Sequence, residues 1–334
     1  MLYNHMDTSM SRKLFALSLT ATLMGGAAYA ETPQVAVDIA PVHSLVARVM
    51  DGIGKPDLII QPGASPHEYS LRPSEASALQ AADLVFWIGP DLTPWLTDTI
   101  GTLASDAVVT ELMEADGTIK LEFREGALFE AHDHDDHGDD DDHDDHGDDD
   151  DHDEAESGHE DHDHGAHDPH AWLSPKNAMN WLNVIAGQLS AVDPDNAGAY
   201  FANAAAGRTE IKTLIGEVTA TLDPVRGGQF IVFHDAYQYF EMDFDFPASG
   251  AISISDASDP SPARIAKIQA RIAEQGIDCV LAEPQFNPGL VATVLDGTDA
   301  QTGILDPLGS DLELGPAFYP QLIRNLSNVL ADCM

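Results

Sequence analysis

The sequence predicts an α/β protein in which two α/β lobes, each with a parallel-type sheet, are joined by a single long helix. At 334 residues the chain is long enough for two domains with cores of their own. Short apolar runs alternate with helical patterns in both halves of the chain, which is typical of parallel sheets covered by helices. A long unbroken helical pattern lies between the halves. We therefore expect lobes at residues 31–192 and 227–334, and a linking helix within 193–226.

The second observation is an internal similarity between the lobes. The segment LRPSEASALQAADLVFWIGP in the first half resembles SPARIAKIQARIAEQGIDCVLAEP in the second half. Both segments predict a helix, then a strand, then a loop that contains Pro. The identity is low, so the similarity indicates a shared architecture and no more.

The expected elements follow from the hydrophobic periodicity. In the first lobe we expect strands at 34–39, 57–60 and 83–88, and helices at 42–50, 73–80 and 175–189. In the second lobe we expect strands at 229–233, 278–282 and 302–305, and helices at 236–240, 261–275, 290–295 and 316–330. The linking helix is expected at 194–222, where an Ala-rich run has apolar residues at helical spacing. At 1.5 Å per residue it is about 40 Å long, more than one lobe needs.

A segment rich in His and Asp interrupts the first lobe at residues 130–168. It has more than twenty acidic residues and no Lys or Arg, and it carries roughly half of the net charge of −42. It cannot bury apolar surface, so we expect a disordered, solvated loop. An acidic solubilising linker would not explain the spacing of its histidines, whereas imidazoles beside carboxylates are ligands for a divalent metal such as zinc. We expect weak metal binding by His132, His134, His137, His143, His146, His152, His159, His162, His164 and His167.

The N-terminus has the pattern of an export signal. Arg12 and Lys13 precede a short apolar region, and Ala28-Tyr29-Ala30 has the form of a cleavage site. We expect a signal peptide at 1–30 with the mature chain beginning at Glu31, and Met10 is an alternative start. No other segment is long and apolar enough to span a membrane. We expect a soluble protein outside the cytoplasm, and its acidic charge argues against nucleic acid or anionic membranes as partners.

The chain has two cysteines, Cys279 and Cys333. Two thiols in an exported protein more often pair than stay free. Cys279 lies in an apolar run that predicts a buried strand, and Cys333 is the penultimate residue. A disulfide would therefore connect the last helix to the second sheet.

Three histidines outside the acidic loop are candidate metal ligands. His67 follows Ser65-Pro66, His170 follows Asp168-Pro169, and His234 ends the strand QFIVF. Ligand-binding residues of open α/β sheets gather at the carboxyl ends of strands, so these positions predict one shared site. Asp306, which directly follows another strand, is the fourth candidate.

Five ordered blocks then resemble a known family: GASPHEYSLRPSEASALQAADLVFWIGP, DPHAWLSP, FHDAYQYF, LAEPQF and GILDPLG. They are similar to the periplasmic zinc-binding component of bacterial ABC zinc uptake systems, in cluster A-I (cluster 9) of the substrate-binding proteins. The resemblance spans essentially the whole mature chain. It implies a metal held between two lobes by His67, His170 and His234, a His-rich insertion before the second ligand, and a Cys279–Cys333 disulfide.

The fourth ligand stays open between Asp306 and water. Some relatives use an acid just before the first His, but here that position is Pro66. Glu68 is a weaker alternative because adjacent side chains diverge, and His43 is better explained as a polar residue at a helix end. Asp235 and Glu283 are expected to orient imidazoles through hydrogen bonds.

Three imidazoles with at most one carboxylate suit Zn²⁺, whereas Mn²⁺ prefers a shell richer in oxygen. We therefore expect a monomeric receptor that is not an enzyme, binds Zn²⁺ and delivers it to a membrane ABC permease. A manganese or iron receptor of the same family is the alternative. A zinc hydrolase is disfavoured because the sequence has no HExxH and no clear general base. A metal buffer that works through the loop alone is the third hypothesis.

Overall fold

The computed structural model describes residues 1, 32–124, 129, 167–253 and 260–334. The expected signal peptide, the starts at Met10 and Glu31, and nearly all of the His/Asp segment lie outside these residues. Residues 32–334 form one compact unit. No helix in the described part of the chain is both long and apolar enough to cross a membrane.

The first sheet has four parallel strands in the order β2-β1-β3-β4. Its strands are β1 (Val35–Val37), β2 (Asp57–Leu58), β3 (Leu84–Trp87) and β4 (Val108–Glu111). Helices α1 (Ala40–Val49), α2 (Pro73–Ala81) and α3 (Pro94–Leu103) connect them in sequence. β3 is buried along its whole length, as expected for a central strand with helices on both faces.

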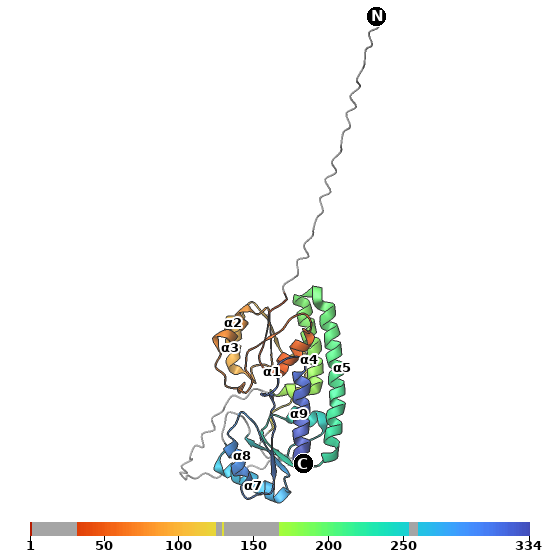
Figure 1. Cartoon of the computed structure of the whole chain (residues 1–334). Helices are drawn as coiled ribbons and strands as arrows, with labels where there is room; N and C mark the ends of the chain where they lie inside the picture. The colour runs from red at the N-terminus through yellow and green to blue at the C-terminus, as the bar shows by residue number, and fades with distance from the viewer. Residues whose placement is uncertain (2–31, 125–128, 130–166, 254–259) are drawn as a thin grey trace, which may run out of the picture. The chain divides into compact units, whose positions relative to one another are not determined.

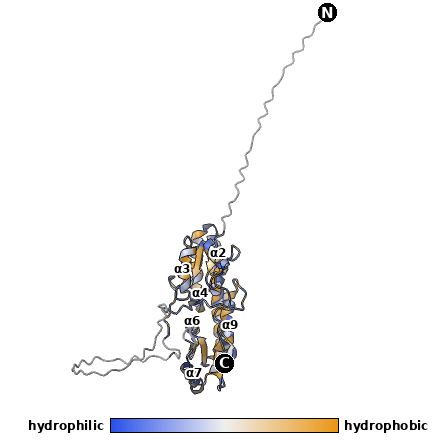
Figure 2. Cartoon of the chain, turned by 90° about the vertical axis from the view of Figure 1, so that its left-hand side faces the viewer, coloured by the Kyte–Doolittle hydropathy of each residue, from blue (hydrophilic) through white to orange (hydrophobic). Residues whose placement is uncertain are grey.

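The second sheet is also parallel, in the order β6-β5-β7-β8. Its strands are β5 (Phe230–His234), β6 (Ala251–Ser253), β7 (Cys279–Ala282) and β8 (Gln301–Ile304). Its helices are α6 (Gln238–Phe244), α7 (Pro262–Gln275), α8 (Pro288–Leu295) and α9 (Phe318–Cys333). Several strands are coloured as hydrophobic in Figure 2.

Alternation along β5 gives this sheet two different faces. Ile231 and Phe233 belong to a small core cluster with side chains of α7 and α8, whereas Phe230 and Val232 belong to the main core with α9. Successive side chains of a strand point to opposite faces, so one short strand supplies both cores. The end of β5 thereby holds His234 within a rigid frame.

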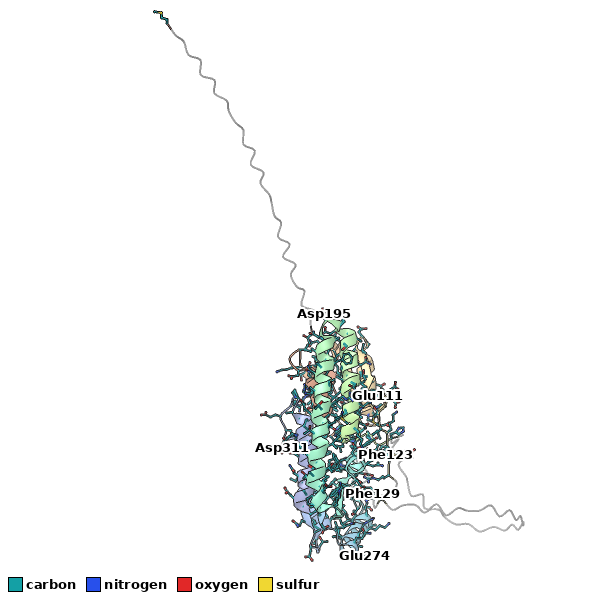
Figure 3. All side chains as sticks on the ribbon, turned by 90° about the vertical axis from the view of Figure 1, so that its right-hand side faces the viewer. Glu111, Phe123, Phe129, Asp195, Glu274 and Asp311 are labelled. Carbon is teal, nitrogen blue, oxygen red and sulfur yellow. A yellow bond between two sulfur atoms is a disulfide. The ribbon has the colours of Figure 1, made fainter. Side chains whose placement is uncertain are left out.

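Two long helices pack side by side, and the second of them extends along both lobes (Figure 1). The first is α4 (Pro175–Val192), and α5 (Ala197–Leu222) follows after a single 3₁₀ turn at Pro194–Asn196. α5 packs against α1 and α4 of the first lobe and against α9 of the second. Figures 1 and 3 show α5 beside α4. At Gly207 an added Cβ would lie 3.0 Å from Leu182 of α4, so glycine permits this close approach.

The fold class is confirmed: two α/β lobes with parallel sheets and a long joining helix. Three elements were missed in the sequence, namely α3, β4 and β6. β4 and β6 are edge strands, whereas the other two edge strands, β2 and β8, were expected at 57–60 and 302–305. The expected disulfide is present between Cys279 of β7 and Cys333 of α9.

Candidate metal centre

The expected ligands are placed by a strand end, a 3₁₀ turn and a loop. His234 is the last residue of β5, and Glu283 directly follows β7, its neighbour in the sheet. His170 precedes the 3₁₀ turn Ala171–Leu173 that leads into α4, and His67 lies in the loop between β2 and α2. All four residues line the same pocket. Sequence positions 67, 170 and 234 are thus brought together by the topology.

His170 and His234 face each other across this pocket. Their Nε2 atoms are 3.4 Å apart and their ring centroids 5.2 Å apart. In a tetrahedral zinc site with Zn–N bonds of about 2.0–2.1 Å, two ligand nitrogens stand about 3.3–3.4 Å apart. The two imidazoles therefore already have the separation of neighbouring zinc ligands.

Each of these imidazoles is held by a buried carboxylate. Nδ1 of His170 lies 2.7 Å from Asp168 Oδ1, and Nδ1 of His234 lies 2.8 Å from Glu283 Oε1. Because a carboxylate accepts, each Nδ1–H donates, which leaves the Nε2 lone pair for the pocket. This arrangement of carboxylate, imidazole and metal is the usual support of a histidine ligand.

Burial dominates the electrostatics of the two carboxyl groups. It raises the pKa of Asp168 to about 7, opposed by the His170 backbone N–H and by the charge of Arg124. Burial likewise raises the pKa of Glu283, opposed by His234. A cation in the pocket would favour the ionised form of both groups.

His67 is farther from the pair. Its ring centroid is 5.8 Å from that of His170, and the side chain is half-buried. Within residues 32–124, 129, 167–253 and 260–334, no three His, Cys, Asp or Glu side chains stand close enough together to hold a metal ion. Coordination by all three histidines thus requires His67 to approach the other two. Its loop is held to α3 by Trp95, whose Nε1 donates to the Pro66 carbonyl at 2.8 Å.

The remaining sequence candidates lie elsewhere. Asp306 lines a neighbouring groove rather than this pocket, and its carboxylate accepts hydrogen bonds from Gln285, Leu308 and Ser310. Glu68 is exposed. His43 is buried with its Nε2 3.1 Å from the Pro56 carbonyl oxygen. His167, the one described histidine of the acidic segment, is half-buried and does not line the pocket.

The expectation that the Asp235 carboxylate orients an imidazole is wrong. Asp235 instead forms an ion pair with Arg124, which also binds Glu241 of α6 at 2.7 Å. The Arg124 guanidinium also lies 3.6 Å from the ring centroid of Phe129, labelled in Figure 3. Arg124 thus connects the segment after β4 to Asp235, the residue just after His234.

Two supporting residues were missed in the sequence. Asp168 stands two positions before His170 in DPH, a spacing that allows one carboxylate to accept from both the backbone N–H and the ring. Arg124 is the last positive charge before the acidic segment. Its carboxylate partners, Asp235 and Glu241, lie more than 100 positions away, so only the folded chain reveals them.

The family model for the periplasmic component A of the zinc-uptake complex matches residues 35–333. The chain belongs to this zinc-uptake component A family. It is 48% identical over 323 residues to the high-affinity zinc uptake system protein ZnuA of Brucella abortus (strain 2308), covering 96% of this chain and 97% of the relative. The name of this family identifies its members as components of a zinc-uptake complex.

Two solved structures share the fold. One is a crystal structure of ZnuA, with a TM-score of 0.70, 21% identity, and coverage of 90% of this chain and 99% of the other. The other is the substrate-binding protein FpvC from Pseudomonas aeruginosa in complex with Mn²⁺, with a TM-score of 0.71, 18% identity, and coverage of 91% and 98%.

Proposed function

We propose that this protein is a high-affinity receptor that captures Zn²⁺ in the periplasm and delivers it to an ABC permease for import. The observation that carries the proposal is the pair of Nε2 atoms of His170 and His234, 3.4 Å apart, each imidazole being held by a carboxylate. Membership of the zinc-uptake component A family supports the same cargo and the same kind of partner.

The proposed ligands are His67, His170 and His234, and Asp306 contributes to the fourth position as a ligand or through a ligand water. Three neutral imidazoles form a borderline donor set that suits Zn²⁺. Manganese is the second candidate, because a structural neighbour is described with Mn²⁺. A shell rich in nitrogen favours zinc over manganese, which prefers carboxylate and carbonyl oxygen.

The proposed role is transport without catalysis. The two carboxylates nearest the imidazoles, Asp168 and Glu283, are engaged in holding them and are not disposed as general bases. The proposed localisation is the periplasm, in soluble form after removal of residues 1–30, and the proposed state is a monomer. The expected partners are the zinc ion and the permease, with neither nucleic acid nor membrane insertion involved.

Metal titration of the mature chain tests this function. Replacing His67, His170 or His234 by Ala should weaken zinc binding by orders of magnitude, because each change removes a metal–nitrogen bond. Asp306→Ala should weaken binding less than any of the three. Nanomolar binding by a triple His→Ala variant that also lacks residues 131–166 would contradict the assignment. Turnover of model esters or amides would instead favour the hydrolase, and complete loss of binding on removal of residues 131–166 alone would favour the buffer.

A further inference from the structure

One residue that lines the histidine pocket, Gln285, carries a buried amide oxygen without a role in the proposed zinc site. Gln285 lines the pocket together with His67, His170 and His234. Its Oε1 is buried from solvent, and it has no hydrogen-bond partner within the described part of the chain. A buried acceptor without a donor costs free energy, so such an atom calls for an explanation.

The orientation of this amide is set by Asp306. Gln285 Nε2 donates to Asp306 Oδ1 at 3.1 Å. The reverse orientation would bring Oε1 against the carboxylate, and two acceptors repel each other. Asp306 therefore directs the amide oxygen, rather than the amide nitrogen, away from itself.

Asp306 has little capacity left for a metal. Its Oδ1 accepts from Gln285 Nε2 and from the Leu308 N–H at 3.0 Å. Its Oδ2 accepts from the N–H and the hydroxyl of Ser310, both at 2.6 Å. An ionised carboxylate offers about four lone-pair sites, and all of them are used here. Direct coordination would require Asp306 to give up bonds that shape its own loop.

We infer that a water molecule is the fourth zinc ligand and that Gln285 Oε1 accepts a hydrogen bond from this water. Asp306 acts on the site by orienting the Gln285 amide. The inference rests on the proposed zinc-receptor function. Zinc makes its bound water a stronger acid, and hence a better donor, than bulk water. Direct ligation by Oε1 is disfavoured, because neutral amide oxygens are ligands of hard cations such as Ca²⁺ rather than of Zn²⁺.

This arrangement makes Gln285 a positioning residue with a consequence for selectivity. A shell of three imidazoles and one water, completed by a neutral acceptor, places no carboxylate on the ion. Such a shell suits zinc better than manganese. A Gln285 variant is therefore expected to lose more zinc affinity than manganese affinity.

The test is a double-mutant cycle on zinc affinity in the mature chain, measured by chelator competition. Gln285→Met, which keeps the size of the side chain, should weaken zinc binding 10–100-fold, the range typical of groups that support metal ligands. Asp306→Ala should weaken it less. In the double variant the affinity should equal that of Gln285→Met alone, because Asp306 acts through the amide. Additive losses would show that Asp306 acts independently and would overturn the inference.

Gln269→Met is the matched control. The Gln269 Nε2 donates to the Thr293 carbonyl at 2.8 Å in the same lobe, so the same chemical change there should leave zinc affinity unaltered. If Gln285→Met fails to fold, Gln285→Asn replaces it, because the shorter amide cannot reach both Asp306 and the water. An unchanged zinc affinity of Gln285→Asn would overturn the inference.

Crystals of the zinc-loaded protein give a direct readout. A zinc-bound water within about 2.5–3.0 Å of Gln285 Oε1 is expected. Coordination of zinc by Asp306 or by Oε1 itself would refute the inference. If the His→Ala variants lose zinc binding while Gln285→Met binds zinc normally, this inference alone is refuted. If the His→Ala variants retain zinc binding, the proposed function itself is refuted.

Discussion

At the residue scale, the most consequential contacts are those between the imidazoles and their carboxylates. Glu283→Gln keeps the size of the side chain but removes the charge that makes His234 a strong donor to zinc. Zinc affinity should fall about 10–100-fold. The control is Asp193→Asn, since Asp193 is a buried carboxylate that accepts from the Tyr200 hydroxyl at 2.9 Å outside the pocket. Equal affinities for the two variants would mean that Glu283 does not support the site.

The same contacts predict a pH dependence of zinc binding. An imidazole binds zinc only when its nitrogen is deprotonated, so protons compete with the metal. The apparent affinity should be constant at alkaline pH and should decrease as the pH falls through about 6.5, the ordinary pKa of histidine. Chelator competition between pH 5 and 7.5 measures this dependence. A flat profile would argue against a shell dominated by histidine.

At the scale of elements, the disulfide joins the last helix to a central strand. Cys279 is fully buried in β7, and Cys333 at the end of α9 is 5% exposed. Closing a loop with a sequence separation of 54 contributes about 4 kcal/mol in the chain-entropy model, an upper-end figure. The double variant Cys279→Ala, Cys333→Ala should therefore unfold at clearly lower denaturant concentration.

Zinc binding should be insensitive to this change, because neither cysteine lines the histidine pocket. The measurement pairs urea unfolding with zinc competition on the same samples. A large loss of zinc affinity in the folded double variant would show that α9 positions the site, contrary to this expectation. Two accessible thiols in the oxidised wild-type protein would contradict the disulfide itself.

At the scale of the whole molecule, the question is how residues 131–166 relate to the pocket. His170 and His234 already stand at the separation of neighbouring zinc ligands, whereas a chain that organises its own ligands loses conformational entropy when it binds. Deleting 131–166 should leave one tight site, remove several weak sites, and slow uptake mainly when zinc is scarce. Part of that slowing should disappear at high ionic strength, since dense negative charge attracts cations over a screened distance.

Calorimetric titration with and without this segment counts the sites directly. Loss of the tight site on deletion would mean that the segment supplies a ligand, and one of the three histidines would then be misassigned. A histidine-free segment of equal length and acidity is the matched control for its charge.

The sequence by itself determined the class of the fold. Strand and helix periods alternate strongly, and the buried central strands are continuous apolar runs, so β1, β3, β5 and β7 were all predictable. Two of the four edge strands, β4 and β6, were not predicted, whereas the edge strands β2 and β8 were. The strand tendency of an edge depends on its neighbour in the sheet as well as on its own residues.

For the site, the sequence determined which histidines stand at a strand end or at a Pro-containing turn, and therefore the candidates His67, His170 and His234. Only the tertiary structure decided which carboxylate serves which group: Asp168 holds His170, Asp235 pairs with Arg124, and Asp306 holds Gln285. A hydrogen bond depends on distances of tenths of an ångström between residues far apart in the chain. Such distances are set by the packing of two sheets and their helices, and no local pattern encodes them.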